Sequence, residues 1–170
     1  IWSWYSGLPL KVAAGSSQEF GQSSAATASA VPIAADTFGN SIHSGIAGDP
    51  ATNVATSGNP AKGGTGLNLF GNPVAVFQSF RPVLLSQDTN GNISGTLRGM
   101  ARWNVDFTVG KKFQYTERVS STLTVQMFNV FNHVQFNDPS LSLQSPSSFG
   151  VISTQLNTPR VIELGMHFDF

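Results

Sequence analysis

The strongest constraint on this chain is the strict alternation of its final segment, residues 160–170. Every second residue there is apolar up to the last, and the positions between are mostly charged or glycine. Successive side chains of a β-strand point to opposite faces, so this segment is predicted to be a strand with one fully apolar face. It is also long enough to cross a bilayer, because a tilted transmembrane strand needs only about 9–11 residues. The apolar face consists of Ile162, Leu164, Met166, Phe168 and Phe170.

This alternation has two interpretations. A half-buried strand of a soluble sandwich shows the same pattern. The pattern also resembles the C-terminal strand of bacterial outer-membrane β-barrels, whose apolar residues, ending on an aromatic, are read by the barrel-assembly machinery. The choice between the two depends on the rest of the chain.

Composition excludes several classes of function. The 170 residues carry no net charge and only 11% are charged, about half the share of an ordinary soluble domain. No basic stripe exists to neutralise phosphates, so we expect no nucleic-acid partner. The absence of cysteine removes disulfides and thiolate metal sites, and the apolar runs are too short for a transmembrane helix. Because the chain opens on Ile1 rather than methionine, we expect a longer parent protein whose N-terminal part and export signal are missing here.

Three further segments alternate and are predicted to be strands: residues 1–15, 102–113 and 119–131. Trp103 and Phe113 stand at opposite ends of one apolar face. A rise of about 3.3 Å per residue and a tilt of about 40° separate them by about 25 Å, which matches the lipid band between the aromatic girdles of a barrel. Pro9 predicts irregular pairing in the first strand. Residues 128–132 are apolar on both faces, which predicts a bulge or a strand end packed against loops.

The predicted strands are joined by two long polar connections, residues 16–101 and 133–159. Connections this long are usually functional or disordered. Within the first, residues 73–85 are predicted as short strands and residues 88–92 as a turn, whose glycine is misplaced for a calcium loop. If Phe170 ends at the periplasmic face, the short turn at 114–118 is periplasmic and both long connections are extracellular, which is the rule for such barrels.

Together these segments predict an all-β fold, an open antiparallel meander of about four long strands. Such a sheet is too narrow to pair its own edges, because single-chain bacterial barrels have about eight strands or more. We therefore expect a fragment of a transmembrane β-barrel with unpaired first and last strands. The expected strand order is 1–15, 102–113, 119–131, 160–170.

Several motifs resemble the C-terminal barrel of TonB-dependent outer-membrane receptors, in particular the Oar-like branch. The run Asn104-Val-Asp106-Phe-Thr-Val-Gly-Lys111-Lys-Phe113 is similar to that branch's Asn-x-Asp strand, which ends in Lys-x-Phe. The run Phe128-Asn-Val-Phe-Asn-His133 is similar to its Phe-Asn-x-Phe-Asn-His run. The remaining matches in order are Ser6-Gly7-Leu8-Pro9, Phe136, Pro139, Phe149-Gly150 and Pro159-Arg160.

The resemblance implies an outer-membrane receptor or transporter whose barrel wall surrounds a ligand-uptake channel. It implies as partners outer-membrane lipid, the barrel-assembly machinery, a plug domain, further barrel strands of the parent chain and, through the parent only, TonB. The chain departs from the family at Thr124-Val125-Gln126, where an Arg-x-Glu usually precedes the Phe-Asn. A charged contact by that pair is therefore not expected here.

The polar face of the predicted strands supplies candidate ligand-path residues, because barrel lumens are polar and lumen residues tune selectivity. The alternative is that these side chains are solvated or paired wall residues that bind no ligand. The candidates are Asn104, Asp106, Gln126, Glu163 and His167. The histidines lack short ligand spacing and no catalytic motif is present, so we expect no metal, no cofactor and no enzymatic activity.

Two other classes explain part of the pattern. A soluble β-sandwich binding module accounts for the alternation and the polar loops, but not for aromatics at both strand ends. A trimeric autotransporter-type membrane anchor also contributes a few strands per chain. Such anchors have short loops and follow a heptad stalk, and neither feature occurs in this sequence.

Overall fold

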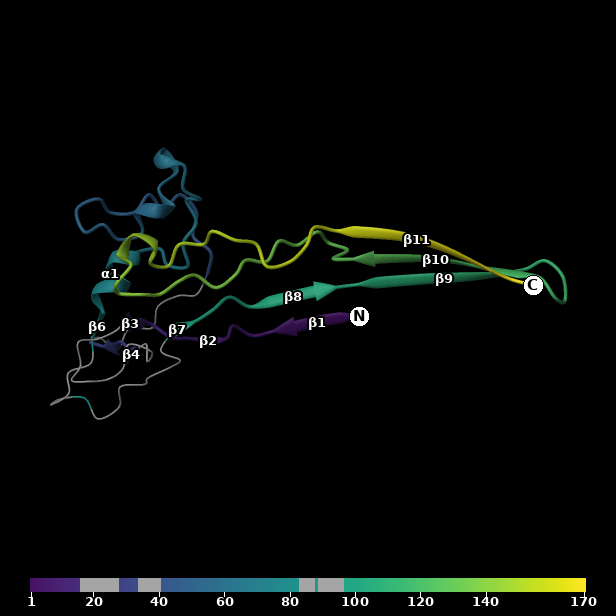
Figure 1. The fold of residues 1–170 in the computed structure, drawn as a ribbon, viewed down its shortest axis with the longest axis horizontal. Helices are drawn as coiled ribbons and strands as arrows, with labels where there is room; N and C mark the ends of the chain where they lie inside the picture. The colour runs from purple at the N-terminus through teal and green to yellow at the C-terminus, as the bar shows by residue number, and fades with distance from the viewer. Residues whose placement is uncertain (16–27, 34–40, 83–87, 89–96) are drawn as a thin grey trace. The chain divides into compact units, whose positions relative to one another are not determined.

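The structure is a computed structural model that describes residues 1–15, 28–33, 41–82, 88 and 97–170. The chain divides into two compact units, each built from segments that are separate in the sequence (Figure 1). Unit 1 consists of Ile1–Tyr5, Arg102–Phe136 and Gln155–Phe170, and unit 2 of Ser6–Ala101 and Asn137–Thr154. Among the described residues, no helix has the length and apolar character needed to span a membrane.

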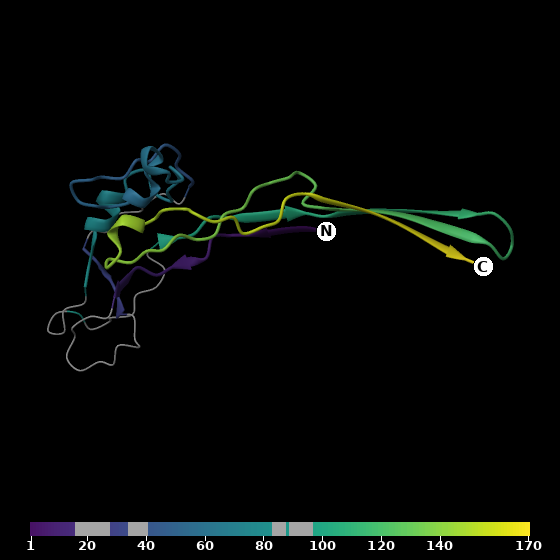
Figure 2. The ribbon, with the colours of Figure 1, turned by 45° about the horizontal axis from the view of Figure 1, so that its top comes forward.

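Unit 1 is an antiparallel meander. Strands β9 (Phe107–Gln114), β10 (Ser120–Phe128) and β11 (Val161–Asp169) form a three-stranded sheet in the order β11-β10-β9. Strand β1 (Trp2–Tyr5) pairs with β8 (Arg102–Val105), which leads through Asp106 into β9. Figures 1 and 2 both show β9, β10 and β11 side by side. The predicted all-β fold and strand order are confirmed, and β1 and β11 belong to different sheets.

The register of the three-stranded sheet aligns like residues into rows. Val125 pairs with Val109 on one side and Leu164 on the other, and Thr124 in the same way with Gly110 and Gly165. Because opposite residues in a ladder point to the same face, the sheet has one apolar face and one polar face. The rows of the apolar face are Phe107–Met127–Ile162, Val109–Val125–Leu164, Lys111–Leu123–Met166 and Phe113–Ser121–Phe168. The rows of the polar face are Thr108–Gln126–Glu163, Gly110–Thr124–Gly165, Lys112–Thr122–His167 and Gln114–Ser120–Asp169.

The prediction of one continuous strand over residues 1–15 is wrong. After β1 the chain forms β2 (Pro9–Leu10), paired with β7 (Leu97–Arg98), and β3 (Ala13–Gly15), paired with β4 (Ala28–Ser29). The interruption lies at Gly7, whose backbone touches that of Gly99 so closely that a Cβ on Gly7 would stand 1.8 Å from the Gly99 carbonyl oxygen. Pro9, which lacks an N–H, adds to the irregularity.

The predicted strands over 102–113 and 119–131 are also shortened. Asp106 separates β8 from β9, and β10 ends at Phe128. Asn129 has a positive φ of 50°, a conformation that ends a strand and that asparagine tolerates better than most residues. The turn between β9 and β10 is closed by hydrogen bonds from the N–H groups of Tyr115 and Thr116 to the Val119 carbonyl.

Residues 73–85 were predicted as short strands, which is wrong for most of their described part. Pro73–Gln78 is the helix α1, and only Phe80–Arg81 forms a strand, β6, which pairs with β5 (Val31–Pro32). The helix starts there because Asn72 caps it, accepting a hydrogen bond from the Ala75 N–H at 3.1 Å, and because Pro73 suits the first helical position.

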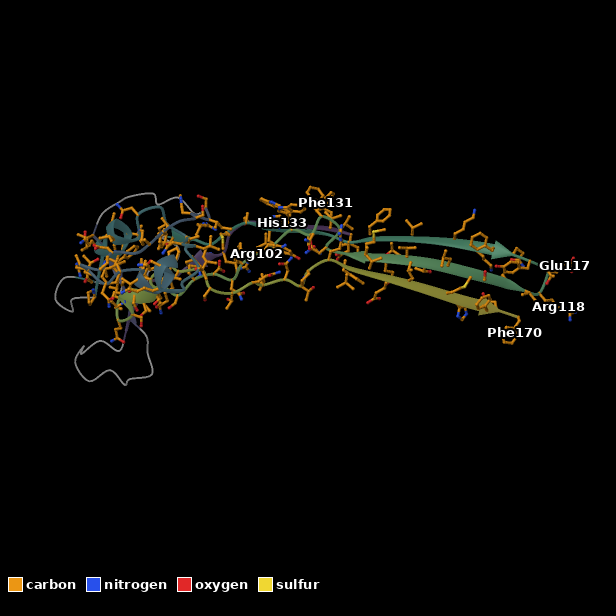
Figure 3. All side chains as sticks on the ribbon, turned by 90° about the horizontal axis from the view of Figure 1, so that it is seen from above. Arg102, Glu117, Arg118, Phe131, His133 and Phe170 are labelled. Carbon is orange, nitrogen blue, oxygen red and sulfur yellow. The ribbon has the colours of Figure 1, made fainter. Side chains whose placement is uncertain are left out.

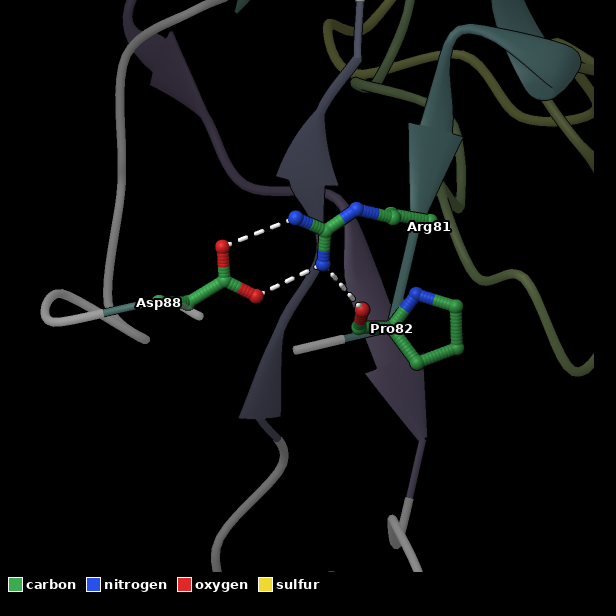
Figure 4. A network of polar contacts seen from close by, with 3 residues as sticks. All are labelled: Arg81, Pro82 and Asp88. Carbon is green, nitrogen blue, oxygen red and sulfur yellow. Dashed lines mark hydrogen bonds and ion pairs between the residues drawn. The ribbon is translucent and has the colours of Figure 1, made fainter. Parts of the chain in front are cut away.

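Arg81 is held by Asp88 (Figure 4). Its two terminal nitrogens donate to the two carboxylate oxygens at 2.6 and 2.8 Å. This side-chain hydrogen bonding raises the pKa of Arg81 above its ordinary value, desolvation opposes the shift, and the charge of Asp88 adds to it. Of the turn predicted over residues 88–92, all but Asp88 lies outside the described residues.

Unit 2 has its own apolar core, to which both long connections contribute. Phe149 is fully buried between Phe70, whose ring centre is 6.0 Å away, and Phe77, which it meets edge-on at 5.1 Å. Asn68, also fully buried, donates to the Phe149 carbonyl and accepts from the Phe70 N–H. The described part of unit 2 also contains three short 3-10 helices: η1 (Thr56–Gly58), η2 (Pro60–Lys62) and η3 (Pro146–Ser148).

The close approach at Gly7 predicts that replacement by alanine lowers the stability far more at Gly7 than at Gly110. Gly7→Ala should lower the free energy of unfolding by about 1–3 kcal/mol, the usual range for overpacking, because backbone atoms must move aside. Gly110→Ala is the control, since the nearest atom to its added Cβ is 3.9 Å away. Urea unfolding of the full-length protein in detergent measures both, and equal losses would contradict the contact.

Candidate functional site

A cavity of about 460 Å³ opens on the polar side of unit 1, at the end of the sheet where β10 stops. Its walls come from β8, β10, β11 and the segment that returns the chain to β11. Amide, hydroxyl and carboxylate groups predominate, with one aromatic ring. The lining residues are Asn104, Asp106, Phe128, Asn129, Gln135, Asn157, Thr158, Val161 and Glu163.

The structure brings three of the five predicted ligand-path residues to this cavity. Asn104, Asp106 and Glu163 line it together. Gln126 lies opposite Glu163 in the ladder and so belongs to the same face, outside the cavity wall. His167 lies farther along β11, opposite Thr122, and is exposed. Its Nε2 stands 3.0 Å from Asp169 Oδ1, so this histidine belongs to a local pair at the other end of the strand.

Asn129 organises the floor of the cavity. It is 7% exposed, and every polar group of its side chain has a partner. Its Nδ2 donates to the carbonyls of His133 and Thr158 at 3.2 and 3.1 Å, and its Oδ1 accepts from the His133 N–H at 2.9 Å. Its own N–H donates to Asp106 Oδ1 at 3.0 Å, the same oxygen that accepts from Asn104 at 2.8 Å.

Two more asparagines fasten the returning segment. Asn157 donates to the His133 carbonyl at 2.6 Å and accepts from the Gln135 N–H at 2.8 Å. Asn132, whose φ is also positive, accepts from the Arg160 N–H at 3.1 Å just before β11 begins. The side chains of the run 128–133 therefore replace the backbone ladder that ends at Phe128.

The opposite side of unit 1 is apolar and exposed to an unusual degree for large side chains. Leu164 is 75% exposed, and Ile162, Met166 and Phe168 are each more than half exposed. A contiguous apolar surface of this kind normally contacts a protein or a membrane. Among the described residues, no second sheet pairs with β9–β11 or covers this face.

Aromatic rings stand at both ends of that apolar face. Trp4 and Trp103 pair across β1 and β8, and Phe131 lies 5.9 Å from Trp103. At the other end are Phe113, Phe168 and Tyr115, whose hydroxyl meets Ser121 Oγ at 2.9 Å. Figure 3 shows Phe131 and His133 at one end of the sheet and Glu117, Arg118 and Phe170 at the other. Aromatic residues at both ends of an apolar band are typical of the two girdles of a membrane barrel.

The model of the family described as the outer membrane beta barrel domain matches residues 1–163. The chain belongs to this family. The membership places the protein in the outer membrane and agrees with a sheet whose two faces meet different surroundings. The comparisons with curated proteins and with solved structures found no match.

Sequence reasoning identified three wall residues of this barrel domain's cavity but missed four polar ones: Asn129, Gln135, Asn157 and Thr158. Asn129 stood in the run 128–132, which was predicted as a bulge or a strand end packed against loops, but its side chain was not predicted to line a cavity. The available signal was the asparagine itself, which favours the left-handed conformation where a strand ends. Asn157 and Gln135 become neighbours only through the fold, because the segments on which they lie pair antiparallel.

A second cavity, of about 390 Å³, lies in unit 2 of the barrel domain. Hydroxyl side chains and glycine backbone provide most of its wall, and residues of both long connections contribute. Its polar side chains are Ser57, Thr65, Asn137, Asp138, Ser140, Ser148, Ser153 and Thr154.

The hydrogen bonds of Asn129 predict a large effect of its removal. Asn129→Ala should destabilise the barrel domain by about 2–5 kcal/mol, combining about 1–2 kcal/mol for alanine with a positive φ and about 1–3 kcal/mol for buried partners left unpaired. Asn129→Gly loses the same hydrogen bonds but avoids the backbone penalty of alanine. Its stability should therefore lie between those of Asn129→Ala and the parent protein. Urea unfolding of the full-length protein tests this order, and a glycine variant as unstable as the alanine variant would contradict it.

Proposed function

We propose that this chain forms the C-terminal barrel wall of a TonB-dependent outer-membrane receptor of the Oar-like branch, which takes up a ligand across the outer membrane. The observation that carries the proposal is the cavity that Asn104, Asp106 and Glu163 line on the polar face. Asn104 reaches it from β8, Asp106 from the link between β8 and β9, and Glu163 from the last strand, β11.

The motifs that resemble the Oar-like branch have defined places in this structure, which supports the proposal. The Asn-x-Asp run supplies Asn104 and Asp106, which are hydrogen-bonded to each other. The Phe-Asn-x-Phe-Asn-His run supplies Asn129, which binds Asp106. The two motifs therefore form one hydrogen-bond network in the wall of the cavity.

The chemistry of the cavity limits the class of ligand that it can bind. Of the described residues, Asp106 and Glu163 are the charged ones in its wall, and none of them that lines it is a lysine, arginine or histidine. Two carboxylates without a cation repel an anion and favour an uncharged or cationic ligand. The amides of Asn104, Gln135 and Asn157 provide donors and acceptors for such a ligand.

The further partners follow from the same proposal. Outer-membrane lipid covers the apolar face, and the barrel-assembly machinery reads Ile162, Leu164, Met166, Phe168 and Phe170. A plug domain and the remaining strands of the parent chain complete the receptor, and TonB acts through the parent. We further propose that the chain is not an enzyme and binds no nucleic acid, since the sequence has neither catalytic spacing nor a basic stripe.

The orientation of the wall is part of the proposal. Both long connections contribute to the core of unit 2, where Phe149 from the second connection packs against Phe70 and Phe77 from the first. Connections that share a core lie on the same side of a membrane. The short β9–β10 turn joins the opposite strand ends, so short periplasmic turns and long extracellular connections follow.

If the apolar face contacts lipid, an arginine should cost very different amounts of stability at two adjacent residues of β9. Val109→Arg, in a central row of the apolar face, should cost about 2–4 kcal/mol near the bilayer midplane. Thr108→Arg places the same side chain on the polar face, where water can solvate it, and should cost much less. Urea unfolding of the full-length protein in lipid vesicles measures both, and equal costs would argue against a membrane wall.

The orientation predicts which sites an impermeant thiol reagent reaches. The chain contains no cysteine, so single cysteines report cleanly. In the full-length protein on whole cells, Lys62→Cys and Ser145→Cys, one from each long connection and both exposed, should be labelled. Glu117→Cys, in the β9–β10 turn, should be labelled only after the outer membrane is opened. The reverse pattern would overturn the orientation and, with it, a receptor that meets its ligand outside the cell.

A further inference from the structure

We propose that Lys111 binds the phosphate of an anionic phospholipid in the membrane leaflet beside the turn at 115–119. The inference rests on the proposed function, because it takes the apolar face as the lipid-facing surface. It goes further by assigning a headgroup contact to one residue on that face.

Lys111 is a cation on an otherwise apolar surface. In the ladder it pairs with Leu123, which pairs with Met166. Along its own strand the neighbours on the same face are Val109 and Phe113. None of the aligned rows on this face contains an acidic residue. The described residues therefore offer Lys111 no carboxylate partner on its face, and an anion must come from the surroundings.

The position of Lys111 along the strand selects the headgroup region. Its row lies next to the last row, Phe113–Ser121–Phe168, where Tyr115 also folds over Ser121. Aromatic residues of this kind mark the interface of a membrane barrel. Two residues of strand, tilted by about 40°, correspond to a depth of only about 5 Å. The flexible stem of lysine can lie along the apolar surface over such a distance while the ammonium reaches the headgroups.

The chemistry of the ligand follows from the charge and the depth. A phosphate diester supplies the acceptor oxygens and the negative charge that an ammonium requires. Inorganic phosphate has no reason to enter an apolar face, whereas a phospholipid presents its phosphate at this depth while its acyl chains cover Leu123 and Met166. In the proposed orientation the turn at 115–119 is periplasmic, so the leaflet is the inner one, which consists of phospholipid.

Lys112 provides a matched control within the same strand. It has the same charge and lies one residue away, but it pairs with Thr122, opposite His167, on the polar face. Replacement of either lysine changes the net charge equally. The two lysines lie on opposite faces of the sheet, so only Lys111 is placed to reach the lipid headgroups.

The test compares urea midpoints of the full-length protein in vesicles of phosphatidylcholine alone and of phosphatidylcholine mixed with phosphatidylglycerol. For the parent protein we expect a higher midpoint in the anionic mixture, and this difference should shrink at high salt. Lys111→Gln should lose most of the difference, Lys111→Arg should keep it, and Lys112→Gln should keep it. Inorganic phosphate added to the neutral vesicles should leave every midpoint unchanged.

A full lipid-dependent difference in Lys111→Gln, or an equal loss in Lys112→Gln, would overturn the proposal. So would a shift of the parent midpoint by inorganic phosphate. The Val109→Arg and Thr108→Arg pair, measured in the same vesicles, separates this failure from failure of the proposed function. If Val109→Arg is the costlier change while Lys111→Gln behaves like the parent, the face meets lipid and only the Lys111 contact is wrong.

Discussion

The structure of unit 1 depends on the backbone register that joins β9, β10 and β11. With Val125 opposite both Val109 and Leu164, the apolar residues of the three strands fall on one side, except for the pair Phe128–Val161, which lines the cavity on the polar side. A slip of a single residue between neighbours would exchange the two faces of a strand and bring Glu163 into line with the apolar row. In hydrocarbon the same ladder has a second role, because backbone N–H and C=O groups there have no water to bind. The register therefore satisfies the backbone hydrogen bonds and also determines which side chains lie on the apolar face and which on the polar face.

Where that ladder stops, asparagine side chains take over its hydrogen bonds. Beyond Phe128 the chain turns, and Asn129 binds the carbonyls of His133 and Thr158 that a regular strand would have satisfied. Asn132 does the same for the Arg160 N–H, immediately before β11. One backbone bond, from the Val130 N–H to the Val105 carbonyl, continues the pairing with the preceding strand beyond Phe128. The cavity exists because these side chains hold the returning segment away from a flat continuation of the sheet.

Much of unit 1 could be predicted from the sequence because period-two alternation reports a face directly. Residues 162–170 were sufficient to predict β11 and its apolar side, and 103–113 did the same for β8 and β9. The break at Asp106 was not predictable in this way, because it follows from a hydrogen bond to Asn129, a residue distant in the sequence. The contact of Gly7 with Gly99 is equally invisible to local patterns. Helix α1 was missed although Asn72-Pro73 is a local start signal, since six residues are too few to show a helical period.

The core of unit 2 could not be predicted from period-two alternation, because it forms between two connections that show no such pattern. Each long connection alone would lose conformational entropy on ordering without enough apolar surface to offset it. Phe149 from one connection and Phe70 and Phe77 from the other supply that surface only together. Asn68 adds a buried pair of hydrogen bonds across the same junction, so the contact is specific as well as apolar. The described parts of the two connections therefore order each other, so that segments which read as polar loops in the sequence fold once they meet.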